Sequence, residues 1–177
     1  SDGAGKIVEV GNKKNNFLIN KFVWICGGSK DKIYGTCSEY FATNLKNIVI
    51  VPDNINLSTA SCLGVPVATA YYSLFSNKVS KEKFIFISGG AGAVSQYAIQ
   101  FAKLNNYKVI TTVSSKKKEI ICKKIGADLI INYKRIKKKH IIDSITDYTK
   151  GKMVDRCIEV DLGYNINLLP QLLKNNG

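Results

Sequence analysis

The chain has 177 residues, of which 45% are hydrophobic and 22% charged, a balance typical of globular proteins and not of disordered or fibrous ones. Its 26 basic and 13 acidic residues give a formal net charge of +13, which raises a nucleic acid or an anionic membrane as a partner. Only Arg135 and Arg156 carry the forked guanidinium group that nucleic-acid sites favour, so we interpret the charge mainly as a solvated lysine surface and expect no nucleic acid as partner.

The first sixty residues predict a β-rich segment. Its strands are expected at three short β-branched runs, residues 7–10, 22–25 and 48–51. Turn-like stretches with Gly and Asn separate these runs. After Pro52, Ser58 is the predicted cap of a short helix over residues 59–62, and a second helix is expected over residues 68–75.

From Lys83 the pattern changes to alternating strands and helices. The expected strands are apolar throughout and cover residues 84–88, 108–113, 129–132 and 153–160. Helices are expected after each of them, at residues 94–102, 116–125, 141–148 and 165–173, the last of them interrupted or started late by Pro170. Such strands, joined by amphipathic helices, form a parallel sheet covered on both faces. The predicted fold class is therefore α/β, with a Rossmann-like domain over residues 66–177 and part of a β-rich domain over residues 1–65.

A glycine-rich turn lies between the predicted strand at 84–88 and the next helix. It reads Gly90-x-Gly92-x-x-Ser95, a pattern that in this position is typical of dinucleotide binding. Glycine lets the backbone approach a pyrophosphate, and the N–H groups of the helix start favour its negative charge. The alternative is a tight turn without a ligand. Ser95 replaces the third glycine, and its side chain is expected either where helix meets strand or beside the phosphates.

The end of the next strand indicates the type of dinucleotide. Proteins that prefer NAD usually carry Asp or Glu about 20 residues beyond the first glycine, where it holds the ribose 2′-hydroxyl. Residues 111–118 instead offer hydroxyl and ammonium groups, with no acid before Glu119. These groups suit the 2′-phosphate of NADP(H), so NADPH is the predicted cofactor. A solvated, lysine-rich helix start is the alternative.

Several segments carry motifs of one known family. They are residues 1–11, 35–41, 51–53, 60–71, 88–100 and 126–133. Together they resemble the zinc-independent quinone oxidoreductase branch of the medium-chain dehydrogenase/reductase superfamily, the branch that includes zeta-crystallin. The resemblance implies that the β-rich segment is part of a GroES-like catalytic domain. It also implies that the chain corresponds to roughly the middle half of a full subunit.

The resemblance implies a set of cofactor-binding residues: Thr69, Gly90, Gly92, Ala93, Val94, Ser95, Ser114, Lys118 and Tyr133. The backbone of the glycine turn would hold the pyrophosphate. Ser114 and Lys118 would contact the 2′-phosphate, with Lys116 and Lys117 as near alternatives. Tyr133 corresponds to a tyrosine near the adenosine end of the cofactor.

Thr69 falls where the family places a threonine close to the nicotinamide, although a hydroxyl bonded to its own helix backbone is an equal alternative. No catalytic acid is assigned. Zinc is not expected, because zinc-dependent relatives carry Gly-His-Glu where this chain reads Ser1-Asp2. The single histidine, His140, lies in a lysine run without Cys or carboxylate at ligand spacing.

The implied activity is hydride transfer from NADPH to a quinone or to an enone-type activated alkene. A 2-enoyl-thioester reductase is one alternative. The other is an NADPH-binding RNA-binding or structural protein, whose footprint would be the basic run at residues 134–139. The resemblance also suggests a homodimer.

The cysteines and the apolar runs indicate the cellular compartment of the protein and its relation to membranes. The five cysteines are odd in number and form no Cys-x-x-Cys pair, so a reducing compartment such as the cytoplasm is expected. No apolar run approaches the roughly 20 residues of a membrane-spanning helix, so no membrane partner is expected. Because the resemblance places the family's N-terminus ahead of Ser1, targeting to an organelle stays open.

Overall fold

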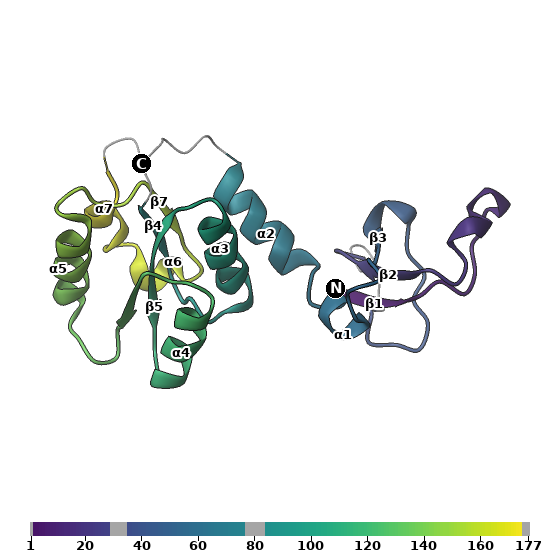
Figure 1. The fold of residues 1–177 in the computed structure, drawn as a ribbon, viewed down its shortest axis with the longest axis horizontal. Coiled ribbons are helices and arrows are strands. Elements are labelled where there is room, and N and C mark those ends of the chain that lie inside the picture. The colour runs from purple at the N-terminus through teal and green to yellow at the C-terminus, as the bar shows by residue number, and fades with distance from the viewer. Residues whose placement is uncertain (1, 29–34, 77–83, 175–177) are drawn as a thin grey trace. The chain divides into compact units, whose positions relative to one another are not determined.

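The computed structural model describes residues 2–28, 35–76 and 84–174, and it divides the chain into two compact units, Ser1–Ala68 and Thr69–Gly177 (Figure 1). The division falls within helix α2 (Val65–Phe75). Within the described ranges, no helix combines the length and the apolar character that crossing a membrane requires.

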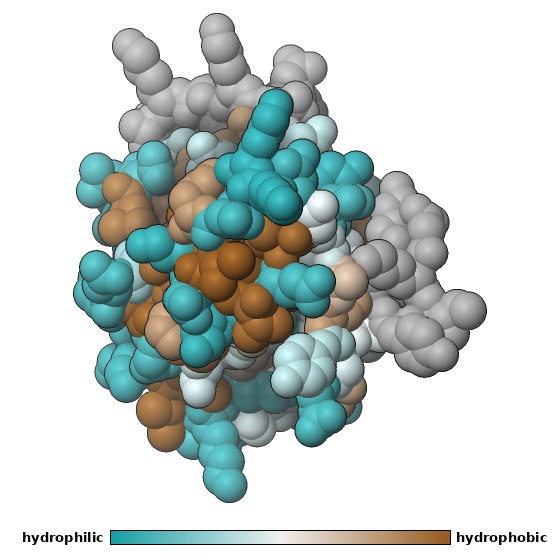
Figure 2. Space-filling model, turned by 90° about the vertical axis from the view of Figure 1, so that its right-hand side faces the viewer, coloured by the Kyte–Doolittle hydropathy of each residue, from teal (hydrophilic) through white to brown (hydrophobic). Residues whose placement is uncertain are grey.

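The first unit is built on a three-stranded antiparallel sheet in the order β1-β2-β3. Its elements in chain order are β1 (Gly3–Lys6), η1 (Lys13–Leu18), β2 (Phe22–Ile25), η2 (Leu45–Asn47), β3 (Ile48–Ile50) and α1 (Leu57–Ala60). Among its described residues the buried hydrophobic side chains are few, namely Leu18, Val23, Val51 and Ala60. Larger ones such as Phe17 and Phe22 are exposed, and Figure 2 shows a face of the molecule on which hydrophobic side chains gather among hydrophilic ones.

Two predictions for this unit are wrong. The first strand covers Gly3–Lys6 and not residues 7–10. Its position follows from pairing with β2 and from Asp2, whose carboxylate accepts hydrogen bonds from the N–H groups of Gly27 at 3.2 Å and Val65 at 2.9 Å. The cap of α1 is Asn56 and not Ser58, because the Asn56 side chain accepts from the N–H of Thr59 at 2.8 Å.

The second unit contains a four-stranded parallel sheet in the order β6-β5-β4-β7. Its strands are β4 (Phe84–Ile87), β5 (Lys108–Val113), β6 (Leu129–Asn132) and β7 (Arg156–Ile158). The chain runs from β4 outward to β6 and then crosses to β7 on the other side of β4. The carboxyl ends of β4 and β7 therefore flank a switch point, the place where open α/β sheets bind their ligands.

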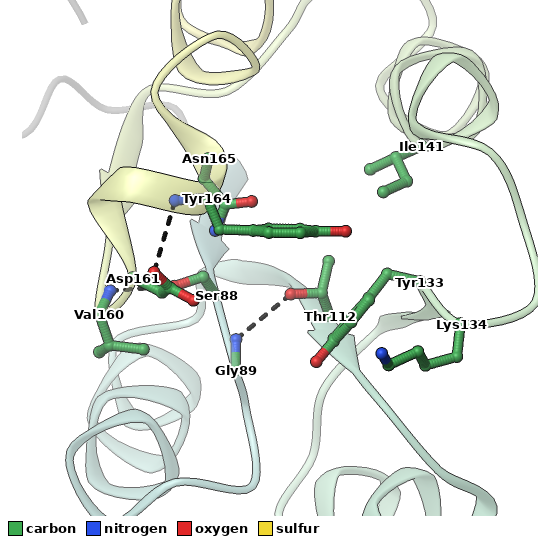
Figure 3. Close-up of a pocket in the computed structure, with 10 residues that line it drawn as sticks. All are labelled: Ser88, Gly89, Thr112, Tyr133, Lys134, Ile141, Val160, Asp161, Tyr164 and Asn165. Atoms are coloured by element: carbon green, nitrogen blue, oxygen red, sulfur yellow. Dashed lines mark hydrogen bonds between the residues drawn. The ribbon is translucent and has the colours of Figure 1, made fainter.

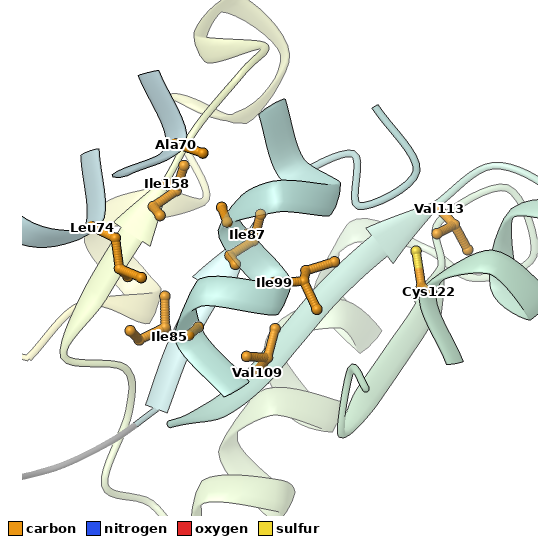
Figure 4. Packing of buried hydrophobic residues seen from close by; sticks show 11 residues of the cluster. Ala70, Leu74, Ile85, Ile87, Ile99, Val109, Val113, Cys122 and Ile158 are labelled. Carbon is orange, nitrogen blue, oxygen red and sulfur yellow. The ribbon is translucent and has the colours of Figure 1, made fainter. Parts of the chain in front are cut away.

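Helices cover both faces of this sheet. Besides α2 they are α3 (Ala93–Leu104), α4 (Lys116–Lys124), α5 (Lys138–Thr149), α6 (Leu162–Asn165) and α7 (Leu169–Leu172). Ile85 and Ile87 of β4 pack against α2, α3 and α4 (Figure 4). Phe86, which points to the other face, packs with α5 and α7. The predicted α/β fold with a Rossmann-like sheet is confirmed.

The last predicted strand is too long. β7 covers only Arg156–Ile158, since Met153 adopts a left-handed φ of 60° that an extended strand cannot contain. The helix predicted over residues 165–173, with an interruption or a late start at Pro170, is two short helices, α6 and α7. Pro170 stands in the first turn of α7, where its missing N–H costs no helical bond.

Candidate functional site

The turn after β4 is built from glycines at positions where a side chain would not fit. Gly89 has a φ of 56°, and its N–H donates to the Thr112 hydroxyl of β5 at 3.2 Å. A Cβ atom at Gly90 would collide with the Thr111 hydroxyl. The N–H of Gly92 donates to the Gly89 carbonyl at 2.8 Å, and Gly92 is the N-cap residue of α3. The chain thus passes from strand to helix in a closed turn lying against β5.

The first turn of α3 presents backbone N–H groups at Ala93, Val94 and Ser95, which have no carbonyl one turn earlier in the helix. The helix dipole adds partial positive charge at the same end. Ser95 is only 1% exposed, and its hydroxyl donates to the Ser88 carbonyl at 2.9 Å. Of the two positions expected for this side chain, the structure shows the junction of helix and strand, so Ser95 has only its backbone N–H to offer a ligand.

A polar network that the sequence analysis missed fastens the segment after β7 to the end of β4. The Ser88 hydroxyl donates to the Glu159 carboxylate at 2.7 Å and accepts from the N–H of Val160 at 3.0 Å. The other oxygen of Glu159 accepts from the Asn165 side chain of α6 at 3.0 Å. The only signal in the sequence is an acidic residue at the end of an apolar strand.

Ser114 and Lys118 lie together at the start of α4, since the Lys118 ammonium group donates to the Ser114 hydroxyl at 3.2 Å. Lys116, one of the two alternatives, is instead paired with Glu119 at 3.0 Å. Hydrogen bonds from Asn132 and from Lys116 lower the pKa of Glu119, which therefore stays charged and partly neutralises Lys116. The structure thus places Lys118, and not Lys116, with Ser114.

A pocket of about 270 Å³ opens at the carboxyl ends of the strands (Figure 3). It is lined by Ser88, Gly89, Thr112, Tyr133, Lys134, Ile141, Val160, Asp161, Tyr164 and Asn165. Tyr133, which follows β6, is the one predicted cofactor residue in this lining. Thr69 is exposed on α2 and does not line the pocket, and its contact with a nicotinamide stays a prediction. Tyr164 lines the pocket without having been predicted.

Two thiols lie close to the site, the buried Cys122 and the partly buried Cys157. Cys157 is on β7, two residues before Glu159, and burial together with the negative charge of Glu159 raises its pKa to about 12. Cys122 of α4 lies beneath the glycine turn, where a Cβ atom on Gly90 would come within 2.9 Å of its sulfur. Burial also raises the pKa of Cys122. Both side chains are therefore neutral thiols near pH 7.

The described residues include no group of three or more His, Cys, Asp or Glu side chains placed to hold a metal ion. His140 is exposed near the start of α5.

Known proteins share the sequence and the fold of this chain. A family model described as zinc-binding dehydrogenase matches residues 93–177. The whole chain is 27% identical to a quinone oxidoreductase of Pongo abelii and covers 52% of it. Over 75% of the chain, identity is 33% to the chloroplastic NADPH-dependent alkenal/one oxidoreductase of Arabidopsis thaliana, of which 36% is covered.

Among solved structures, the quinone oxidoreductase from Coxiella burnetii matches 99% of the chain with a TM-score of 0.82 and 28% identity, over 52% of its own length. The chain spans about half or less of the length of the curated relatives it matches.

Proposed function

We propose that the chain is one of the quinone-oxidoreductase-like proteins of the medium-chain dehydrogenase/reductase superfamily and that it works as an NADPH-dependent oxidoreductase without zinc. The acceptor is a quinone or an enone-type activated alkene, a choice supported by the names of the two curated relatives. The Rossmann-like unit binds the cofactor, and the β-rich unit is part of a GroES-like catalytic domain. The position of Ser1-Asp2, where zinc-dependent relatives carry Gly-His-Glu, supports zinc-independence.

The observation that carries the proposal is the arrangement at the carboxyl ends of β4, β5 and β6. The glycine turn and the first N–H groups of α3 suit a pyrophosphate. Ser114 and Lys118, at the end of the neighbouring strand β5, suit the 2′-phosphate. Tyr133 lines a pocket after β6 that suits the adenosine. These residues fit NADPH, and in the proposed site they hold it along the carboxyl ends of β4, β5 and β6.

When bound, the nicotinamide supplies a hydride, and quinones and enones accept one without a metal because they are already electrophilic. The residues of this chain bind and orient the cofactor. Thr69 is the residue we propose beside the nicotinamide. We further propose a homodimer, supported by the family, in a reducing compartment such as the cytoplasm, supported by the five free cysteines.

Isothermal titration of the chain with NADPH and, separately, NADH tests the proposal. The wild-type chain should bind NADPH more tightly. Ser114→Asp should weaken NADPH binding by about 10-fold or more, because a carboxylate then stands beside the 2′-phosphate, and it should leave NADH binding equal or improved. Ser58→Asp, which adds the same charge at an exposed residue of the first unit, is the control. Equal binding of both cofactors, or binding of neither, would contradict the proposal.

A further inference from the structure

The pocket is too small for a whole dinucleotide. Pockets that enclose a complete drug-sized ligand measure about 300 to 1,000 Å³, whereas this one measures about 270 Å³ and fits one base with its ribose. Its interior is partly apolar, with Ile141 only 2% exposed, and Val160 on the opposite side (Figure 3). A flat base suits such walls better than a phosphate does.

Two tyrosine rings from separate elements meet at this pocket. Tyr164 of α6 and Tyr133 after β6 have ring centroids 5.9 Å apart and planes tilted by 50°. In Figure 3 both rings point toward the middle of the pocket. Tyr164 is 46% exposed, so its ring contributes little to the hydrophobic core that could explain its presence.

Lys138, the first residue of α5, holds Tyr164 at two points. Its ammonium nitrogen lies 4.1 Å from the centroid of the Tyr164 ring, a cation–π contact, and donates to the Tyr164 carbonyl at 3.0 Å. Lys138 does not itself line the pocket. The ring is thus fixed from outside the pocket, and the network of Ser88, Glu159 and Asn165 fixes the backbone that carries it.

We infer that Tyr164, positioned by Lys138, is the surface on which the adenine base of the cofactor stacks, with Tyr133 at the edge of the base. The inference rests on the proposed function and deepens it, because it names the residue that recognises the adenine. Aromatic rings bind any base through its flat π face. A ring already held in place loses little conformational freedom when the base arrives.

The test is isothermal titration of Tyr164→Leu and Tyr164→Phe with two ligands that both carry the adenine, NADPH and adenosine 2′,5′-bisphosphate. The Leu variant should bind each ligand about 10-fold more weakly, by the same factor for both. The Phe variant, which keeps the ring, should bind both as the wild type does. A nuclear Overhauser contact between the adenine protons and the Tyr164 ring protons should be seen in the wild type and lost in the Leu variant, while any contact to Tyr133 remains. Tyr72→Leu, an equally drastic change at an exposed tyrosine of α2, is the matched control.

Lys138→Met provides a second route that leaves Tyr164 in the chain. It should weaken the binding of both ligands several-fold. Lys139→Met removes the same charge from the next residue and should leave the binding of both ligands unchanged. The inference is wrong, while the proposed function stands, if the wild type binds NADPH and the Leu variant binds it equally well. The same holds if the Leu variant binds NADPH more weakly but binds the bisphosphate as the wild type does. If the wild type binds neither ligand, the proposed function itself fails.

Discussion

Gly90 has no room for a side chain. A Cβ atom there would collide with the Thr111 hydroxyl and approach the Cys122 sulfur to 2.9 Å. Gly90→Ala should therefore lower the free energy of unfolding by about 1 to 3 kcal/mol through overpacking, as measured by urea denaturation. Gly163→Ala is the matched control, because no atom lies within 4 Å of its Cβ position. If the two variants have the same free energy of unfolding, the turn accommodates the added methyl group and the prediction is wrong.

The sequence predicts those parts of the candidate site whose residues are close together in the chain. The glycine turn and the pairing of Ser114 with Lys118 follow from residues close together in the chain. Tyr164 was missed because its place in the pocket depends on its ring meeting that of Tyr133 after β6, about 30 residues earlier in the chain. The position of the Ser95 side chain was left between two choices, since only the fold shows that the Ser88 carbonyl lies within reach.

Asp128 ties three elements of the second unit together. It lies just before β6, and its carboxylate accepts from Lys103 of α3 and from the N–H of Val109 of β5, both at 2.7 Å. Burial raises the pKa of Asp128, but the hydrogen bonds from Lys103 and Val109 and the positive charges of Lys103 and Lys108 outweigh burial, so its pKa is lowered overall. A lowered pKa in the folded state means that the ionised carboxylate stabilises the fold.

Asp128→Asn should lower the free energy of unfolding by about 1 kcal/mol at pH 7, a value reduced for the partial exposure of the pair. The contribution is complete above the ordinary aspartate pKa of about 3.9. It is lost as the pH falls through the lowered pKa of the folded state. Urea denaturation at pH 7 and again below about pH 3 should show the difference between wild type and variant shrinking. The exposed Asp147→Asn is the control, and a difference independent of pH would contradict this account.

Strands of the parallel sheet were predicted best at β5 and β6. Both have the predicted bounds, because the runs at residues 108–113 and 129–132 are rich in the β-branched and apolar residues that parallel strands favour. β1 was misplaced because Gly3, Ala4 and Gly5 have low β-propensity, and its pairing with β2 overrides that preference. Pairing partners and anchors such as Asp2 are distant in sequence, so residue patterns alone do not show them.

The positive charge of the molecule is concentrated in one part of the chain. Residues 113–152 hold twelve basic and four acidic residues, a net +8 of the total +13, and they include Ser114, Lys118 and Tyr133. NADPH carries one phosphate more than NADH, with a charge near −2. The affinity of the chain for NADPH should therefore fall more steeply than its affinity for NADH between about 50 and about 300 mM salt, because exposed charges are screened. Isothermal titration of both cofactors measures the two slopes, and equal slopes would place the 2′-phosphate away from these charges.

Quinones and enones alkylate thiolates. An enzyme with the proposed activity is therefore exposed to substrates that can modify its own cysteines. Cys157 and Cys122, the two cysteines of the second unit, are both held as neutral thiols, and Cys157, with a pKa of about 12, is almost never ionised at neutral pH. In the proposed enzyme, the burial that packs β7 and α4 would therefore also protect the strand and the helix beside the cofactor site from alkylation. Resistance to the proposed substrates would then be a consequence of packing in the hydrophobic core.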